Sequence, residues 1–223
     1  MKKIIITLDG PAGSGKTSTA KIVANSLNYL YIDTGAMYRA VALACLRNKL
    51  EINEVSIAKL LPKIAIKLAT GESGQLTFLN GEDVSQEIRT PEVTRISSPI
   101  SALPAVRAKL IAMQQEMGIH GGIVMDGRDI GTVVFPHAEL KIFLNASIEV
   151  RAERRTKELL ARGLQADLET IKSEIAERDH RDRTREISPL IKAEDAVEID
   201  TSAMTIDQQA AEILRLARRI LEK

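Results

Sequence analysis

A glycine-rich segment near the start of the chain, placed directly after an apolar run, limits what the chain can fold into more than any other feature. Residues 10–17 read Gly-Pro-Ala-Gly-Ser-Gly-Lys-Thr, and residues 4–8 before them read Ile-Ile-Ile-Thr-Leu. The order Gly10, four residues, then Gly15, Lys16 and Thr17 matches the Walker A pattern, in which a strand precedes the loop and a helix follows it. The sequence therefore predicts a strand, a phosphate-binding loop and a helix.

The residue types of this loop suit a nucleotide phosphate. Glycines let backbone N–H groups converge on phosphate oxygens, and the positive end of the following helix faces the same anion. We expect an exposed Lys16 that reaches the β and γ oxygens, and Thr17 is expected to offer its hydroxyl to Mg²⁺. A glycine-rich turn that binds nothing is the alternative, which the strand, the spacing and the Lys-Thr pair together disfavour. The residues predicted to hold ATP are Gly10, Pro11, Ala12, Gly13, Ser14, Gly15, Lys16, Thr17 and Ser18.

Short apolar runs that alternate with helical patterns indicate an α/β fold with a five-stranded parallel sheet flanked by helices. The predicted strands are residues 4–8, 30–32, 123–125 and 140–144, with a weaker fifth at 197–199. Polar residues follow the first four, namely Asp9, Asp33, Asp126 and Asn145. Ligands of such sheets bind beyond the carboxyl ends of the strands, so these positions are candidate site residues.

Two long segments carry elements of their own. The stretch between Asp33 and Ile123 is too long for one crossover. Within it, residues 60–68 are predicted helical, 75–79 and 82–84 form a hairpin around Asn80-Gly81, and Pro104 opens a helix that ends near Gly118. The arginine-rich segment 149–185 is predicted helical with a break at Gly163.

Composition narrows the function classes. Lys and Arg number 31 against 30 Asp and Glu, so no overall positive field favours a nucleic-acid partner. The single cysteine, Cys45, excludes an intrachain disulfide, and its apolar neighbours favour burial. The apolar run at the start ends at Asp9, which favours a strand over an export signal, and no run approaches the roughly 18 to 20 apolar residues of a membrane span. We therefore expect a cytoplasmic protein with no membrane or nucleic-acid partner.

Three further segments combine charge with glycine or hydroxyl groups. Residues 33–39 (Asp-Thr-Gly-Ala-Met-Tyr-Arg) could bind a second phosphate at a helix start, or could be an ordinary helix cap with a solvated arginine. Residues 126–132 (Asp-Gly-Arg-Asp-Ile-Gly-Thr) could bind an anion and a base edge, or could be a salt-bridged turn. Asp126 could resemble a Walker B acid, and the Asn-Lys-x-Asp base reader of GTPases is absent from the sequence.

The third segment, residues 177–185, reads Glu-Arg-Asp-His-Arg-Asp-Arg-Thr-Arg. At helical spacing Arg178, Arg181, Asp182 and Arg185 share one face, which could clamp phosphates and a ribose. A solvated helix laced with ion pairs is the alternative, and this segment taken alone favours it.

Together these segments resemble the bacterial type of cytidylate kinase, within the nucleoside monophosphate kinase family. The resemblance runs essentially end to end and rests on residues 10–17, 33–39, 87–93, 126–136 and 177–185, of which 126–136 is the most diagnostic. It implies transfer of the γ-phosphoryl group of ATP to CMP or dCMP. It also implies one kinase domain with a core at 1–33, 119–148 and 186–223. A monophosphate-binding lobe with a small β-sheet would occupy 34–118, and a helical lid 149–185.

The resemblance also assigns roles to individual residues. It implies that Arg39, Arg128 and Arg185 hold the acceptor phosphate, with Thr34 and Asp126 also on the substrate side. Asp182 and Arg178 would meet the ribose, and Ser98, Arg107 and Asp129 the cytosine. The arginines at the start of the lid are Arg151, Arg154 and Arg155, and Arg154 is expected at ATP.

An acceptor phosphate is already anionic at neutral pH, so we expect no general base. Catalysis would come from positioning and charge neutralisation by Lys16, Mg²⁺ and the arginines Arg39, Arg128 and Arg185. Another small-molecule P-loop kinase and a nucleotide switch with an RNA or protein partner are the competing hypotheses. We expect a monomer.

Overall fold

The computed structural model describes residues 3–71, 74–161 and 163–222, and it divides into two compact units. The first unit comprises residues 1–31 and 120–223, and the second comprises residues 32–119. Each unit has its own layer structure and its own buried core, and each is described separately below.

The first unit is built on a five-stranded parallel sheet with the strand order β2-β6-β1-β7-β8. Its strands are β1 (Ile5–Asp9), β2 (Leu30–Asp33), β6 (Ile123–Asp126), β7 (Leu140–Asn145) and β8 (Val197–Asp200), and β2 continues into the second unit. Ile6, Leu8, Val124 and Leu144 are fully buried in the sheet. The prediction of the α/β class and of all five strands is confirmed.

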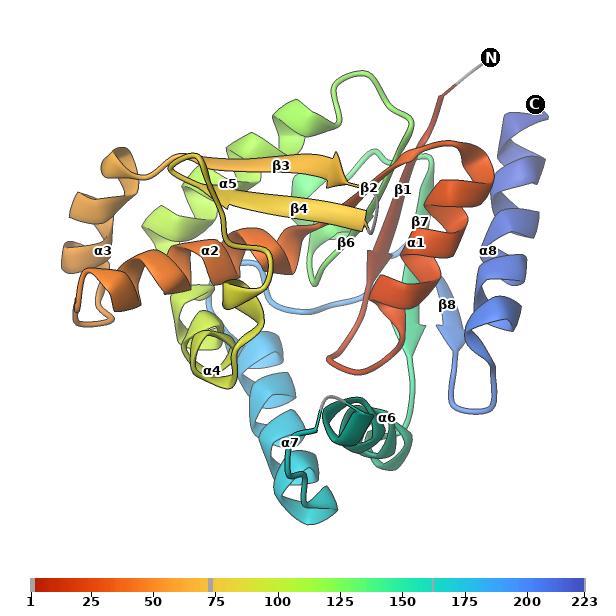
Figure 1. Ribbon diagram of the computed structural model, residues 1–223. Helices are drawn as coiled ribbons and strands as arrows, with labels where there is room; N and C mark the ends of the chain where they lie inside the picture. Colours follow the sequence, from red (N-terminus) through yellow and green to blue (C-terminus); the bar gives the residue numbers. More distant parts are fainter. Residues whose placement is uncertain (1–2, 72–73, 162, 223) are drawn as a thin grey trace. The chain divides into compact units, whose positions relative to one another are not determined.

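Helices of the first unit follow the strands as expected. Helix α1 (Lys16–Leu27) begins directly after the glycine loop and lies beside α8 (Ile206–Leu221) (Figure 1). Helices α6 (Ile148–Ala161) and α7 (Leu168–Thr184) pack against each other, and a π-helical turn, η3 (Ile130–Val134), follows β6. The break predicted at Gly163 is confirmed, since α6 ends before it and its φ of 74° is left-handed.

Each strand of the sheet ends on the polar residue that follows its apolar run. Asp9, Asp33, Asp126 and Asn145 are the last residues of β1, β2, β6 and β7. Leu8 of β1 is paired with Asp126 of β6, and Asp9 with Phe143 of β7. The prediction that these residues lie at the carboxyl ends of the strands is confirmed.

The second unit combines helices with a three-stranded antiparallel sheet of order β3-β4-β5. In chain order its elements are α2 (Thr34–Arg47), α3 (Glu54–Leu60), η1 (Leu61–Lys63), β3 (Ile66–Gly71), β4 (Gly74–Leu79), β5 (Glu82–Asp83), η2 (Glu87–Arg89), α4 (Pro91–Ile100) and α5 (Pro104–Met117). The hairpin at Asn80-Gly81 and the helix that Pro104 opens are confirmed.

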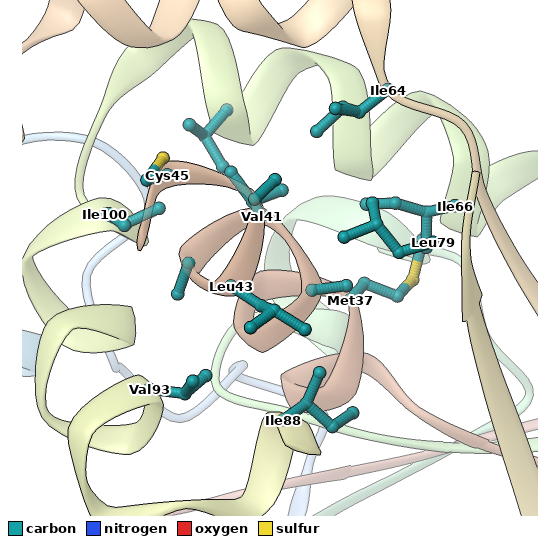
Figure 2. Close-up of a cluster of buried hydrophobic side chains, with 14 of the residues drawn as sticks. Met37, Val41, Leu43, Cys45, Ile64, Ile66, Leu79, Ile88, Val93 and Ile100 are labelled. Carbon is teal, nitrogen blue, oxygen red and sulfur yellow. The ribbon is translucent and has the colours of Figure 1, made fainter. Parts of the chain in front are cut away.

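Helix α2 carries the centre of the core of this unit. Figure 2 shows Met37, Val41 and Cys45 of α2 among apolar side chains from the small sheet and α4. Cys45 is buried, as predicted, and burial raises the pKa of its thiol to about 11. The thiol therefore stays protonated at neutral pH and acts as a small apolar group.

The helix predicted over residues 60–68 is wrong. Helix α3 ends at Leu60, a short 3₁₀ turn containing Pro62 follows, and strand β3 begins at Ile66. Ile64 and Ile66 are buried while Ala65 and Lys67 are exposed, so the apolar residues alternate with a period of two. That alternation is typical of a half-buried strand, and β3 pairs along its full length with β4.

Candidate active site

The loop between β1 and α1 has the backbone conformation that its glycines allow. Gly10, Gly13 and Gly15 have φ values of 144°, 78° and 91°. A Cβ atom on Gly10 would lie 2.0 Å from the carbonyl oxygen of Leu144, so no other residue fits there. Because α1 begins at Lys16, the predicted order of strand, loop and helix is confirmed. The first N–H groups of a helix have no acceptor within the helix, and those of α1 lie next to the loop.

Lys16 extends across this loop. Its ammonium Nζ donates to the carbonyl oxygen of Pro11 at 2.6 Å and to Ser14 Oγ at 3.2 Å. The residue is only 6% exposed, so the expectation of an exposed lysine is wrong. Burial lowers the pKa of Lys16 well below its ordinary value, Arg128 lowers it further, and Asp126 opposes the shift. A cation held in this way interacts strongly with any phosphate that replaces its carbonyl partner.

Thr17 faces the end of strand β6. Its hydroxyl donates to Asp126 Oδ2 at 2.8 Å, and the Tyr31 hydroxyl donates to Asp126 Oδ1 at 2.9 Å. Sequence reasoning singled out Thr17 and Asp126 but missed Tyr31, whose place on the neighbouring strand β2 is a property of the sheet order. These three oxygen-bearing side chains form one hydrogen-bonded group beside the loop.

Two ion pairs, one partly buried and one buried, join the segment after β6 to the end of helix α7. Arg128 Nε lies 3.0 Å from Asp182 Oδ2, and Arg185 Nη2 lies 3.4 Å from Asp129 Oδ1. Burial raises the pKa of Asp182, but the charges of Arg128, Arg178 and Arg185 outweigh it, and the net shift is downward. The solvated-helix alternative therefore does not describe Asp182 or Arg185, because both side chains are buried.

A similar pair opens helix α2 in the second unit. Asp33 caps the helix by accepting from the backbone N–H of Ala36 at 3.1 Å, and its other oxygen lies 2.8 Å from Arg39 Nη2. Burial raises the pKa of Asp33, Arg39 and Arg89 lower it more strongly, and the carboxylate stays ionised. Asp33 is thus a helix cap, whereas Arg39 is a half-buried ion-pair partner. Its Nε is buried with no hydrogen-bond partner among the described residues. Thr34, the first residue of α2, is buried beside this pair.

Ser98 and Arg107 are buried polar residues of the second unit. Arg107 on α5 is 1% exposed, donates to the carbonyl oxygen of Ser101 at 3.2 Å and stacks over the ring of Tyr38 at 5.8 Å. Ser98 lies inside α4, whose cap is Thr90, and its Oγ has no hydrogen-bond partner among the described residues. A buried hydroxyl without a partner is uncommon in native proteins and is a candidate for ligand contact.

Comparison with known proteins identifies the family. A family model described as cytidylate kinase matches residues 6–219. The chain belongs to the cytidylate kinase family. The similarity to this family therefore spans both units and every segment on which the resemblance rested.

Individual relatives agree with this assignment. A protein of Listeria welshimeri named cytidylate kinase is 55% identical over 219 residues, which cover 98% of this chain and 97% of the relative. One of Streptococcus sanguinis with the same name is 52% identical over 225 residues, with both chains fully covered. A solved gluconokinase from Sinorhizobium meliloti is 14% identical with a TM-score of 0.52, covering 99% of this chain and 95% of that one, and it shows a similar fold alone.

The arginines at the start of α6 have separate surroundings. Arg151 is buried against Asp179 of α7, and Arg155 pairs with Glu158 at 2.8 Å. Arg154 Nη2 donates to the carbonyl oxygen of Thr201 at 2.6 Å, and burial lowers its pKa. Contact of Arg154 with ATP, which the cytidylate kinase family pattern implies, stays a prediction.

Asp9 is a buried carboxylate whose partners sequence reasoning missed. Its two oxygens accept from the backbone N–H groups of Ile130 at 2.9 Å and Gly131 at 2.7 Å. Burial raises its pKa to about 7, against the lowering effect of these two hydrogen bonds. Because Asp9 directly precedes Gly10, it ties the phosphate loop to the segment that carries Arg128 and Asp129.

The oxygen atoms beside the loop suit a hard cation. Among the described residues, no group of three or more His, Cys, Asp or Glu side chains could hold a metal ion by itself. Thr17 and Asp126 nevertheless present a hydroxyl and a carboxylate beside the phosphate loop, and Mg²⁺ typically combines one or two such protein oxygens with substrate phosphates. The residues present therefore fit Mg²⁺. Along the described residues, none of the helices has the length and apolar character that crossing a membrane requires.

Proposed function

We propose that this chain transfers the γ-phosphoryl group of ATP to CMP and dCMP, with CDP and dCDP as products. The observation that carries the proposal is the buried Lys16 at the phosphate loop, in the same unit as the Arg128–Asp182 and Arg185–Asp129 pairs. Family membership and the names of the relatives support the choice of substrate.

On the donor side, the loop N–H groups and the start of α1 bind the ATP phosphates. Lys16 exchanges its hydrogen bond with Pro11 for the β and γ oxygens and neutralises charge that develops during transfer. The Thr17 hydroxyl would help to hold Mg²⁺, and the ion would supply positive charge that stabilises the phosphates during transfer. Asp126 orients the Thr17 hydroxyl, and Arg154 contributes to ATP binding.

On the acceptor side, the first unit contributes cations and an acid in fixed positions. Arg128 and Arg185 bind the phosphate of CMP, and each is already oriented by a buried carboxylate. Asp182 accepts from the ribose hydroxyls, with Arg178 beside it on α7. Since the charges of the surrounding arginines outweigh the effect of burial and keep the pKa of Asp182 low, its carboxylate is a strong hydrogen-bond acceptor at neutral pH.

The second unit contributes Thr34 and Arg39 to the acceptor phosphate, and Ser98 and Arg107 to the base. Cytosine differs from uracil by an amino group and an unprotonated ring nitrogen, so a selective pocket needs an acceptor and a donor. Ser98 Oγ and the carboxylate of Asp129 accept, and the guanidinium of Arg107 donates. Uracil would place a carbonyl oxygen against the accepting oxygens and an N–H group against the guanidinium, and mismatches of this kind in polar sites discriminate by orders of magnitude.

No side chain needs to remove a proton during the reaction. The attacking phosphate oxygen of CMP is anionic at neutral pH, so the residues supply orientation and positive charge. Exclusion of water by the α6–α7 lid suppresses hydrolysis of ATP in favour of transfer. Mg²⁺ dependence, a monomeric state and a cytoplasmic location stay predictions.

A coupled assay of ADP release across AMP, CMP, GMP and UMP tests the proposal. We expect turnover with CMP at least tenfold above that with the other three, and little ADP release without an acceptor. Equal turnover of AMP or UMP would indicate a different small-molecule kinase. ADP release without CMP that nucleic acid stimulates would indicate an ATP-driven protein of another class.

A further inference from the structure

Arg151 is a buried arginine that joins three segments of the first unit. Its Nε donates to the carbonyl oxygen of Ala146 at 2.9 Å, and its Nη1 donates to the carbonyl oxygen of Ala12 at 3.1 Å. The same Nη1 lies 2.5 Å from Asp179 Oδ2 on α7. One guanidinium thus contacts the phosphate loop, the end of β7 and the second lid helix.

The phosphate loop also packs directly on the first turn of α6. A Cβ atom on Gly13 would lie 3.1 Å from Cβ of Arg151 and 3.2 Å from its carbonyl oxygen. The loop and the helix therefore meet with no side chain between them, and a change in the loop at Ala12 or Gly13 is transmitted to Arg151.

Asp179 lies among the residues of α7 that the proposed function places at CMP. It directly follows Arg178 and precedes Asp182 by three positions, so the three residues span just over one helical turn. Its Oδ1 is buried without a hydrogen-bond partner among the described residues, and its Oδ2 forms an ion pair with Arg151. The position of this carboxylate therefore depends on Arg151.

From this arrangement we infer that Arg151, through Asp179, is a positioning residue that couples occupancy of the phosphate loop to CMP binding at α7. The inference rests on the proposed function, because it takes ATP to bind the loop and CMP to meet α7. It assigns to Arg151 a role distinct from contact with either substrate.

The physical reason is ordering of shared groups. Phosphates that bind the loop N–H groups fix the peptide at Ala12, and this peptide fixes one hydrogen bond of Arg151. The ion pair then holds α7 with Arg178 and Asp182 in place before CMP arrives, so CMP binding orders fewer groups and becomes tighter. Coupling of this kind is reciprocal and typically changes affinity by 5- to 150-fold.

Isothermal titration of CMP, with and without a non-hydrolysable ATP analogue with Mg²⁺, measures this coupling. In the unmodified chain we expect the analogue to tighten CMP binding about tenfold. Asp179→Asn keeps the shape and one acceptor but removes the charge, and Arg151→Lys cannot reach all three partners with a single nitrogen. In both variants we expect the analogue to tighten CMP binding only about twofold or less. The CMP affinity measured without the analogue should change less than twofold.

The chain offers a matched control on the same two helices. Lys172 of α7 pairs with Glu149 of α6 at 2.9 Å, and the two side chains are 35% and 58% exposed. Among the described residues, this ion pair does not include the phosphate loop. Lys172→Met removes an ion pair between α6 and α7 and should keep the full tenfold coupling. Loss of coupling in this variant as well would show that any loosening of the lid suffices, and would overturn the inference.

The other outcomes are also decisive. If Asp179→Asn keeps the coupling, or if the analogue does not tighten CMP binding to the unmodified chain, Arg151 does not couple the sites. If Arg151→Lys fails to fold, Asp179→Asn alone decides. Absence of CMP binding to the unmodified chain contradicts the proposed function itself and the inference with it.

Discussion

At the scale of single residues, buried carboxylates organise the candidate site. Asp9, Asp33, Asp126 and Asp182 each accept from a backbone N–H, a hydroxyl or an arginine, and each therefore fixes the position of a neighbour. Their residue types were visible in the sequence as acids at strand ends and on a helix face. The partners of Asp9 were not, because the N–H groups of Ile130 and Gly131 are identical in type to every other backbone N–H.

Asp9 makes folding stability depend on pH near neutrality. Its pKa is about 7 in the folded chain, against an ordinary 3.8, so ionisation is less favourable in the folded state. The stability that Asp9 contributes is complete below pH 3.8. It falls by about 1.4 kcal/mol per pH unit as the pH rises from 3.8 towards 7, and the loss is complete above the folded pKa. Denaturant unfolding at pH 5 to 8 should therefore show the unmodified chain losing stability relative to Asp9→Asn. If the difference in unfolding free energy between the unmodified chain and Asp9→Asn does not change with pH, the raised pKa of Asp9 is contradicted.

Asp182→Asn should weaken CMP binding without weakening ATP binding. The amide removes the charged acceptor that we propose for the ribose and a counter-ion of Arg128, and hydrogen bonds to charged groups contribute about 1.5 to 3 kcal/mol. We expect CMP affinity to fall roughly 10- to 100-fold and ATP affinity to stay within about twofold, as measured by titration calorimetry. Loss of ATP affinity with unchanged CMP affinity would contradict the proposed contact between Asp182 and the ribose.

The choice of base is tested by combining Ser98→Ala with Arg107→Met. Both changes remove buried polar groups that the proposal assigns to cytosine, so turnover of CMP should fall much more than turnover of UMP and the ratio should narrow at least tenfold. Ser98→Ala alone removes a hydroxyl that has no hydrogen-bond partner among the described residues, so it separates the effect of this hydroxyl from the effect of losing Arg107. Equal losses with both nucleotides would mean that these residues support the lobe and do not read the base.

At the scale of elements, apolar runs predicted the five strands because strands buried in a parallel sheet are continuously apolar. The same reasoning failed at residues 60–68, where a short alternating stretch can pair as a strand or continue a helix. Pairing of β3 with β4 decided the outcome, and that pairing is a tertiary interaction that a local pattern does not contain. The hairpin around Asn80-Gly81 was predictable because the turn chemistry is local.

Gly81→Ala measures the contribution of this turn. Gly81 has a φ of 87°, and a Cβ atom there would meet nothing within 4 Å, so the substitution strains the backbone without a steric clash. We expect a loss of about 1 kcal/mol in the unfolding free energy and no change in CMP selectivity. An unchanged unfolding free energy would show that the turn conformation does not limit stability.

At the scale of the whole molecule, the chain consists of two compact units that divide at residues 31/32 and 119/120. These limits lie next to the limits of 34 and 118 expected for the inserted lobe. The assignment of that lobe to monophosphate binding stays a proposal. Family membership could be predicted from the sequence because residues 10–17 and 126–136 are contiguous strings. The ion pairs of Arg128 with Asp182 and of Asp129 with Arg185 could not be predicted from the sequence, because their partners lie more than fifty residues apart in the chain.

Phosphoryl transfer from ATP to CMP at Lys16 is the central proposal for this chain. The most direct measurement incubates the unmodified chain and Lys16→Met with Mg²⁺, CMP and ATP labelled on the γ-phosphoryl group, and follows the label. We expect it in CDP, and we expect Lys16→Met to slow its transfer at least 100-fold while keeping the unfolding midpoint, since Met fills much of the same buried volume without the charge. Label released mainly as inorganic phosphate would contradict transfer to CMP, and near-normal transfer by Lys16→Met would contradict the role of Lys16.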